Sequence, residues 1–251
     1  MLNFTEQKLR NSLQQLLKNL HPDANESIIV DVYMHMVAES ETSAAYLSLA
    51  VLNTSYAQAG IAFHLKGSDW KINSGWAKGI DYDSMKKSLH KGDKKSANLY
   101  IVEKFETYGL STFPEDLSKP DELLLDGCIL QAATVPGGIA GLGYTEGIIA
   151  VHEVGHWFGL LHTYSFSGWN GREWVDECLA DGDGLADTPV HTKNKGCKVK
   201  DSCPNQAGTD PIDDFMNLTS DPSAYAKFDA PEVAGDSSIF YERVGNEYSH
   251  N

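Results

Sequence analysis

The chain contains 251 residues, enough for one large domain or two small ones to bury a core without a metal or a disulfide. Hydrophobic residues make up 41% and charged residues 22% of the sequence, a composition that excludes collagen, a coiled coil and long-range disorder. Lys and Arg number 20 against 35 Asp and Glu, so the formal net charge is −15, and neither a nucleic acid nor an anionic membrane surface is an expected partner.

The first twenty residues form neither a transmembrane segment nor a signal peptide, because Glu6, Lys8, Arg10 and Lys18 interrupt the leucines. No apolar run reaches the roughly 18 residues that a spanning helix requires. Leucines three and four apart instead predict an amphipathic helix across residues 4–20. If the protein is exported, its signal peptide is therefore not present in this chain.

The next hundred residues alternate between strand and helix patterns. In chain order the patterns predict a strand, a helix, a strand, a helix and two strands: Ser27–Val37, Tyr46–Ala57, Ile61–Leu65, Ser84–Leu89, Ala97–Val102 and Leu124–Leu130. From Ser165 to Asp214, Gly, Asp, Pro, Asn and Cys dominate without periodicity, which indicates an irregular region tied by disulfides or bound ions. If the chain has two lobes, they divide near residue 162.

The cysteines and the glycosylation sequons are compatible with a secreted protein. Three of the four cysteines fall within a loop-like stretch of 26 residues, which favours disulfides, and the four allow three pairings. The cysteines are Cys128, Cys178, Cys197 and Cys203. Sequons also arise by chance, and here they lie at Asn3, Asn25, Asn53 and Asn217.

The most informative segment is H-E-x-x-H-x-x-G-x-x-H, from His152 to His162, and Thr145 is placed to cap its helix. The i, i+4 spacing puts His152 and His156 on one helix face, so that both can bind one tetrahedral ion at about 2.0–2.1 Å. Glu153, the next residue along the helix, can contact a water bound to that ion and act as the general base that removes its proton. A glycine can turn the chain at the helix end, so that His162 becomes the third ligand.

Two other interpretations of the three histidines are weaker. Histidines spaced for one ion serve packing no better than leucines would. A structural zinc site is normally four-coordinate and rich in Cys, and it would leave Glu153 without a purpose. The motif therefore favours a catalytic metal site with His152, His156 and His162 as zinc ligands.

The motif is the extended signature of the metzincin metallopeptidases, and the rest of the chain resembles the pappalysin family, most closely its secreted fungal members. The similarity runs from about residue 28 to about residue 228. Its segments are Asp31–His35, Gly60–Phe63, Trp76–Ala77, Thr112–Pro114, Val135–Gly138, His162–Tyr164, Asp183–Gly184, Asp187–Pro189, Gly196–Cys197, Asp201–Cys203, Asp210–Ile212 and Phe215–Met216.

The resemblance implies an α+β fold with a metzincin-like catalytic domain: a mixed twisted sheet, an active-site helix above a cleft, and an irregular, disulfide-tied lower subdomain. Residues 1–27 are then an N-terminal helical segment, a candidate propeptide remnant. Residues 28–162 form the upper α/β subdomain with the zinc-binding helix, and residues 163–251 the lower subdomain. Met216 matches the methionine turn that lies beneath the zinc in this family.

The chain departs from the family pattern at two places. Leu218 stands where members commonly have a Tyr whose hydroxyl reaches the metal site, so assistance from that position is in doubt. The family order pairs Cys178 with Cys203, which leaves Cys197 either free or joined to Cys128.

The acidic stretch from residue 181 to residue 188 is a candidate calcium site. Carboxylates that alternate with glycines on a flexible loop suit Ca²⁺, and some relatives bind calcium in this region, although the spacing is not that of an EF-hand. The alternative is a solvated acidic turn. The candidate ligands are Asp181, Asp183, Asp187 and Thr188.

These observations together predict a secreted, extracellular zinc metalloendopeptidase, a monomer that cleaves protein or peptide substrates with metal-activated water and Glu153 as general base. From the family architecture we expect an extended substrate to pair with the strand entering Val135–Gly138. One alternative is a non-catalytic zinc-containing binding protein derived from a protease. Another is a metalloenzyme that acts on an amide-bearing small molecule.

Overall fold

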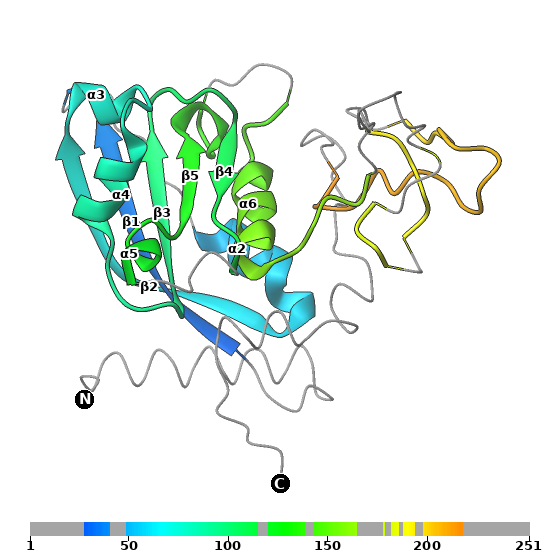
Figure 1. The fold of residues 1–251 in the computed structure, drawn as a ribbon, viewed down its shortest axis with the longest axis horizontal. Helices are drawn as coiled ribbons and strands as arrows, with labels where there is room; N and C mark the ends of the chain where they lie inside the picture. The colour runs from blue at the N-terminus through cyan, green and yellow to red at the C-terminus, as the bar shows by residue number, and fades with distance from the viewer. Residues whose placement is uncertain are drawn as a thin grey trace, which may run out of the picture.

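The computed structural model describes residues 28–40, 49–114, 120–138, 143–164, 178, 182–185, 188–193 and 198–217. Up to residue 164 these residues form a sheet with helices on both faces, and most of the later described residues extend away from it (Figure 1). The helix predicted within residues 4–20, and the whole segment 1–27, lie outside the described residues. Within the described part, no helix is both long enough and apolar enough to cross a membrane.

Five strands form one mixed sheet. They are β1 (Ile28–Ala38), β2 (Ile61–Ile72), β3 (Ser96–Val102), β4 (Gly109–Ser111) and β5 (Cys128–Gln131). The spatial order is β2-β1-β3-β5-β4. Parallel pairing joins β1 to β2 and β3, and β3 to β5, whereas β4 runs antiparallel to β5. In the sheet that the described residues form, β2 and β4 are therefore the edge strands.

Helices cover both faces of this sheet. They are α2 (Leu49–Tyr56), α3 (Ser74–Ala77), α4 (Tyr82–Leu89), α5 (Pro120–Leu123) and α6 (Ile148–Phe158). α2 and α6 share one buried cluster with the sheet, and α3 and α4 share another. Because side chains alternate along a strand, Leu99 of β3 joins the first cluster and Tyr100 the second. β3 is consequently buried along its whole length, as expected for a strand covered on both faces.

The first predicted elements are confirmed over the residues that the structure describes. The strand predicted over Ser27–Val37 is β1, and the helix predicted over Tyr46–Ala57 is α2 followed by a 3-10 turn at Ala57–Ala59. The strand predicted over Ile61–Leu65 continues to Ile72 as β2, because β1 pairs with it as far as that residue.

The later predictions are confirmed for one helix and two strands. Ser84–Leu89 and Ala97–Val102 correspond to α4 and β3. The strand predicted over Leu124–Leu130 starts only at Cys128, because the chain before it turns, with the Leu125 N–H donating to the Glu122 carbonyl. The sequence pattern does not predict α3, α5 or β4, which have 4, 4 and 3 residues and are too short to show a period.

Beyond α6 the described residues contain no further α-helix or strand, in agreement with the expected irregular region. A disulfide joins Cys178 to Cys203, the pair that the resemblance implied, with Cα atoms 5.4 Å apart. Cys128 is a free, buried thiol, so its alternative pairing with Cys197 is wrong. Cys128 is the first residue of β5, and its sulfur atom lies 3.4 Å from the hydroxyl oxygen of Ser111 on β4. Cys197 lies outside the described residues, and the subdomain boundaries near residue 162 stay predictions.

Candidate metal centre

Three histidine side chains converge at the C-terminal end of α6. The Nε2 atom of His152 lies 3.0 Å from that of His156, and the Nε2 atom of His162 lies 3.1 Å from both. His152 and His156 come from one face of α6, as their spacing predicts, and His162 comes from the segment after the helix. Among the described residues, these three form the one group of His, Cys, Asp or Glu side chains that could hold a metal ion.

The end of α6 turns the chain back toward the first two histidines. Gly159 adopts φ 103°, and its N–H donates to the His156 carbonyl at 2.8 Å, while the Leu160 N–H donates to the Gly155 carbonyl at 3.0 Å. This is a Schellman motif, which requires a left-handed residue that glycine supplies without steric cost.

The start of α6 differs from the prediction. Gly147 precedes the first helical residue and no side chain caps it, because Thr145 lies two residues further from the helix.

Backbone carbonyls orient two of the imidazole rings. The Nδ1 atom of His152 lies 2.7 Å from the Phe215 carbonyl oxygen, and that of His156 lies 2.7 Å from the Leu160 carbonyl oxygen. A carbonyl only accepts hydrogen bonds, so Nδ1 carries the proton in each ring and Nε2 keeps its lone pair. Such hydrogen bonds set the tautomer and orientation of metal-binding histidines.

Burial keeps the three rings uncharged. It holds the pKa of His152 well below its usual value, with a further contribution from the neighbouring His156 and His162. Burial likewise lowers the pKa of His156, and it lowers that of His162 to about 3. The neutral imidazole is the form that binds a metal.

This geometry fits a tetrahedral divalent metal. Ligand nitrogens at about 2.0–2.1 Å from such an ion are separated from one another by roughly 3.3 Å. The three Nε2 atoms are 3.0–3.1 Å apart, close to that value. Because lone pairs that face one another at this distance repel, a cation between them would stabilise the arrangement. Imidazole nitrogen is a common ligand of zinc, copper, iron and nickel.

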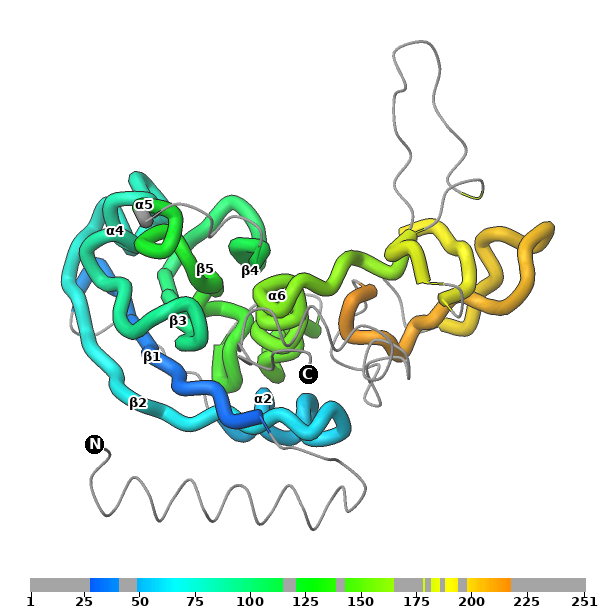
Figure 2. The backbone as a smooth tube through the Cα atoms, turned by 60° about the horizontal axis from the view of Figure 1, so that its bottom comes forward, coloured from blue at the N-terminus to red at the C-terminus, as the bar shows by residue number. Residues whose placement is uncertain are grey.

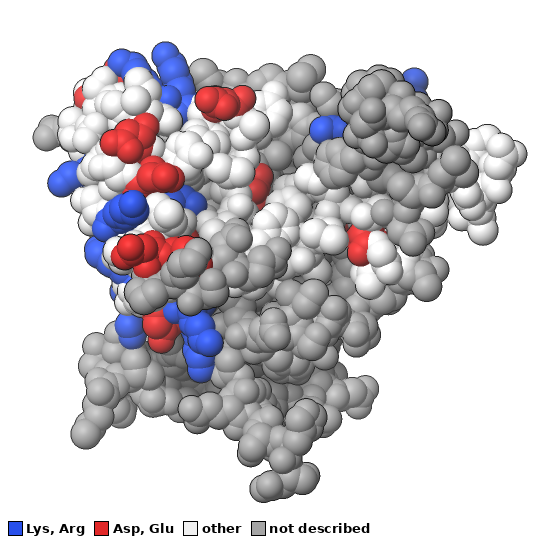
Figure 3. Space-filling view, viewed as in Figure 1, with Lys and Arg blue, Asp and Glu red and all other residues white. Residues whose placement is uncertain are grey.

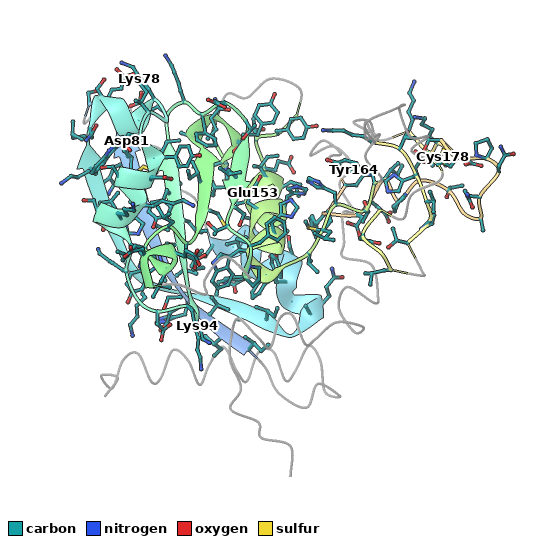
Figure 4. All side chains as sticks on the ribbon, in the orientation of Figure 1. Lys78, Asp81, Lys94, Glu153, Tyr164 and Cys178 are labelled. Atoms are coloured by element: carbon teal, nitrogen blue, oxygen red, sulfur yellow. A yellow bond between two sulfur atoms is a disulfide. The ribbon has the colours of Figure 1, made fainter. Side chains whose placement is uncertain are left out.

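Glu153 lies next to the first histidine on α6 and is 7% exposed. Burial raises the pKa of Glu153 to about 8, and the positive charge of Lys86 acts in the opposite direction. Figure 4 shows Glu153 on α6 beside β4, and Tyr164 on the segment that leaves the helix.

The sequence does not single out Lys86, because a lysine on an amphipathic helix is usually exposed. Here it is buried, and Nζ donates to the Leu125 and Gly127 carbonyls at 2.9 Å.

Met216 packs against α6 from the far end of the described chain. Figures 1 and 2 both show the segment 211–217 returning beside the helix. Met216 is fully buried, and its Sδ atom is the nearest atom to the space that a Cβ atom on Gly155 would occupy. The Thr163 N–H donates to the Met216 carbonyl at 3.4 Å. The residue matched to the methionine turn therefore lies against the helix turn between His152 and His156.

No family model matches the chain. It is 38% identical over 240 residues to an extracellular metalloprotease of Sordaria macrospora, a match that covers 91% of this chain and 78% of the relative. It is 40% identical over 226 residues to an extracellular metalloprotease of Pyricularia oryzae, covering 85% and 75% respectively. The chain belongs to this family of extracellular metalloproteases. A metalloprotease requires a bound metal, and the histidine triad is the candidate for holding it.

The fold of this metalloprotease is also similar to solved structures. Mature mirolysin of Tannerella forsythia, in complex with a cleaved peptide, superposes with a TM-score of 0.63 at 23% identity, covering 87% of this chain and 96% of mirolysin. Mirolysin in complex with compound 9 gives a TM-score of 0.65 at 23% identity, covering 86% of this chain and 95% of mirolysin. This likeness supports the mixed α+β catalytic fold.

Two aromatic rings that the sequence does not assign to the site pack against its histidines. Tyr164 stacks on His162 with ring centroids 4.7 Å apart and planes at 18°. Phe113, which follows β4, lies 5.2 Å from the His156 ring. Both belong to segments that carry the family resemblance, but nothing in their spacing indicates contact with the histidines. They limit the rotation of the two rings.

The candidate calcium ligands of the metalloprotease are described only in part. The Asp183 carboxylate accepts hydrogen bonds from the Thr188 hydroxyl at 2.8 Å and from the Leu185 N–H at 2.9 Å. Asp181 and Asp187 lie outside the described residues, as does Leu218. The calcium site and the effect of Leu218 therefore stay predictions.

The described charged side chains on one face of the sheet and its helices are of both signs. On the face shown in Figure 3, the Lys, Arg, Asp and Glu side chains that the structure describes gather over the sheet and its helices, with both signs intermixed. In this view the described residues therefore show no patch of a single sign. The expectation, from net charge, that nucleic acid is not a partner stays a prediction.

Proposed function

We propose that this protein is a secreted zinc endopeptidase of the metzincin class and the pappalysin family, most similar to the secreted fungal members. The observation that carries the proposal is the convergence of three neutral histidine Nε2 atoms, 3.0–3.1 Å apart, with Glu153 next to them on the helix. The relatives named extracellular metalloprotease support both proteolysis and export.

His152, His156 and His162 would hold the zinc ion. A catalytic zinc site has three protein ligands and keeps its remaining position for water or substrate, whereas a structural site is closed by a fourth protein ligand. The described residues provide three such side chains at this place. When bound, zinc supplies a Lewis acid that polarises the scissile carbonyl and makes water acidic enough to attack near neutral pH.

Glu153 is the proposed general base. Its carboxylate would accept the proton of the attacking water and then donate it to the leaving amine. Both transfers require a pKa near the working pH, and burial moves the pKa of Glu153 in that direction, to about 8 without a metal. A nearby divalent cation would favour the carboxylate form and lower this value.

The structure changes the proposed place of substrate binding. The segment before Val135–Gly138 is β5 followed by a 3-10 turn at Ala132–Thr134, and both edges of β5 are already paired, with β3 and β4. A substrate therefore cannot add to β5. In the described sheet the unpaired edge beside α6 belongs to β4, so we propose that an extended peptide pairs there by main-chain hydrogen bonds.

The register of β4 identifies the backbone groups that face outward. The Tyr108 carbonyl accepts a hydrogen bond from the Gln131 N–H, so residue 108 faces β5. Backbone N–H and C=O groups alternate in direction along an antiparallel strand. Those of Gly109 and Ser111 therefore point to the open edge of the sheet. The Gly109 carbonyl accepts a 2.6 Å hydrogen bond from the Thr107 hydroxyl, a contact that a substrate N–H would have to replace or share.

The decisive experiment compares wild type with Glu153→Gln, using casein hydrolysis, zinc content, and mapping of cleaved peptides by mass spectrometry. We expect internal cleavage by the wild type, its loss with a zinc chelator, and at least a roughly 100-fold loss in Glu153→Gln at unchanged zinc content. Glu146→Gln is the matched control, because Glu146 is exposed just before α6. An inert wild type with full zinc occupancy would support a binding protein, and cleavage of small amides alone would support the second alternative.

A further inference from the structure

The side chain of Glu153 lies directly against the backbone of Gly109 in β4. A Cβ atom built on Gly109 would lie 2.5 Å from the Glu153 Cγ and Oε1 atoms and 2.8 Å from its Cδ atom. All three of the nearest heavy atoms thus belong to Glu153. Non-bonded carbon and oxygen atoms do not approach one another this closely. A side chain at position 109 is therefore incompatible with the present position of the Glu153 carboxyl.

Backbone conformation does not explain why a glycine occupies this position. Gly109 is absent from the described glycines with positive φ, so its backbone is open to any L-residue. A glycine inside a strand lowers stability relative to residues with a side chain, and it often marks a close approach of another group. The close approach here is that of Glu153.

The strand is held too firmly to move away from the helix. β4 pairs with β5, and the Lys86 ammonium donates to the Thr112 hydroxyl at the end of β4 and to the Gly127 carbonyl at the start of β5. Both Lys86, on α4, and Gly127, just before β5, are buried. A Cβ atom at position 109 would therefore displace the Glu153 side chain, which can rotate, rather than the strand.

We propose that Gly109 is a positioning residue for Glu153: the missing side chain in β4 creates the space in which the catalytic carboxylate is held. The inference rests on the proposed function, in which Glu153 is the general base. It also explains how the strand that would bind the substrate backbone can lie next to the group that acts on the scissile bond. The Cβ direction is perpendicular to the sheet, so Gly109→Ala adds bulk toward α6 and not toward a peptide at the strand edge.

The test is the Gly109→Ala variant. We expect kcat for a fluorogenic peptide to fall by about 10- to 100-fold, because a displacement of about 1 Å in a catalytic group can have that effect. KM should change by less than about threefold, and zinc content and thermal midpoint should match the wild type. Gly67→Ala is the control, since Gly67 also lies in a strand of this sheet, without positive φ, and faces the Tyr33 ring. It should leave kcat unchanged.

A double-mutant cycle with Glu153→Asp shows whether the effect passes through Glu153. The shorter carboxylate withdraws from position 109, so adding Gly109→Ala to Glu153→Asp should lower kcat by less than about threefold. An equal loss in both backgrounds, a rise in KM at constant kcat, or wild-type kcat in Gly109→Ala would overturn the inference. A crystal structure of Gly109→Ala with an unmoved Glu153 carboxyl would do so as well.

The two proposals fail in different ways. If Glu153→Gln retains activity, the general-base assignment fails, whatever Gly109→Ala does. If Glu153→Gln is inactive and Gly109→Ala behaves as wild type, only the positioning inference fails. Gly109→Ala could also fold poorly, and the double variant Gly109→Ala with Glu153→Asp then identifies the cause. If the clash with Glu153 is responsible, the double variant recovers the thermal midpoint. If it does not recover, the clash is not the cause.

Discussion

The sulfur atom of Met216 occupies the space that a side chain at Gly155 would need. A Cβ atom on Gly155 would lie inside van der Waals contact with Sδ and 3.2 Å from the Met216 Cε atom. Gly155 is one residue before His156, so the methionine supports the helix turn that carries two of the three histidines.

We predict that Gly155→Ala destabilises the protein by about 1–3 kcal/mol, because it overpacks the Met216 contact. At an unconstrained position inside a helix, the same change would stabilise by roughly 1 kcal/mol. Urea unfolding of the metal-free protein measures the difference. The double variant Gly155→Ala with Met216→Ala should be less destabilised than the two single changes summed, and strict additivity would show that the two side chains do not compete for this space.

Removal of the buried Lys86 charge should destabilise the sheet edge. We expect Lys86→Met to lower the free energy of unfolding by about 3 kcal/mol, because it removes a buried donor from three acceptors and the Thr112 hydroxyl can then donate to only one of the two carbonyls. Those acceptors are the Thr112 hydroxyl and the Leu125 and Gly127 carbonyls. Lys87→Met, on the exposed side of the same helix, is the control and should change stability by less than about 0.5 kcal/mol. Equal effects of the two variants in urea unfolding would contradict the assigned role.

Acid should destabilise the metal-free protein through His162. Burial lowers the pKa of His162 to about 3 in the folded protein, against 6.5 as its ordinary value. Between these values the unfolded chain binds more protons than the folded protein, so stability falls as the pH drops through this window. We expect urea unfolding with a chelator present to show this fall, and His162→Ala to show a shallower one. An unchanged slope in the variant would place the proton uptake elsewhere.

Glu153 should act in the opposite direction at higher pH. Its pKa is raised to about 8 in the folded protein, from 4.5. The folded protein therefore holds a proton that the unfolded chain has lost, and this contribution to stability, fully present below 4.5, disappears as the pH rises through about 8. We expect the metal-free wild type to lose stability between pH of about 7.5 and 8.5, where the histidines are almost entirely neutral in both states. Glu153→Gln should remove that loss, and Glu146→Gln should keep it.

The sequence alone determined the local part of the site. Residues at i and i+4 face one side of any α-helix, and a glycine three residues after the second histidine can end the helix and reverse the chain. The spacing of His152, His156 and His162 is therefore sufficient to predict that they group together. Gly159 does adopt the left-handed conformation that this interpretation required. Strand β1 was predictable for the same reason, since its alternation is a property of neighbouring residues.

Only the tertiary structure decided which distant groups complete the site. The carbonyl that orients His152 comes from Phe215, 63 residues later, and the strand that lies against Glu153 has three residues and no detectable period. Lys86 is buried because Thr112, Leu125 and Gly127 surround its ammonium, and these residues meet only when the sheet forms. Helix and strand patterns report local geometry, whereas the space around Gly109 and Gly155 depends on atoms that folding brings from far along the chain.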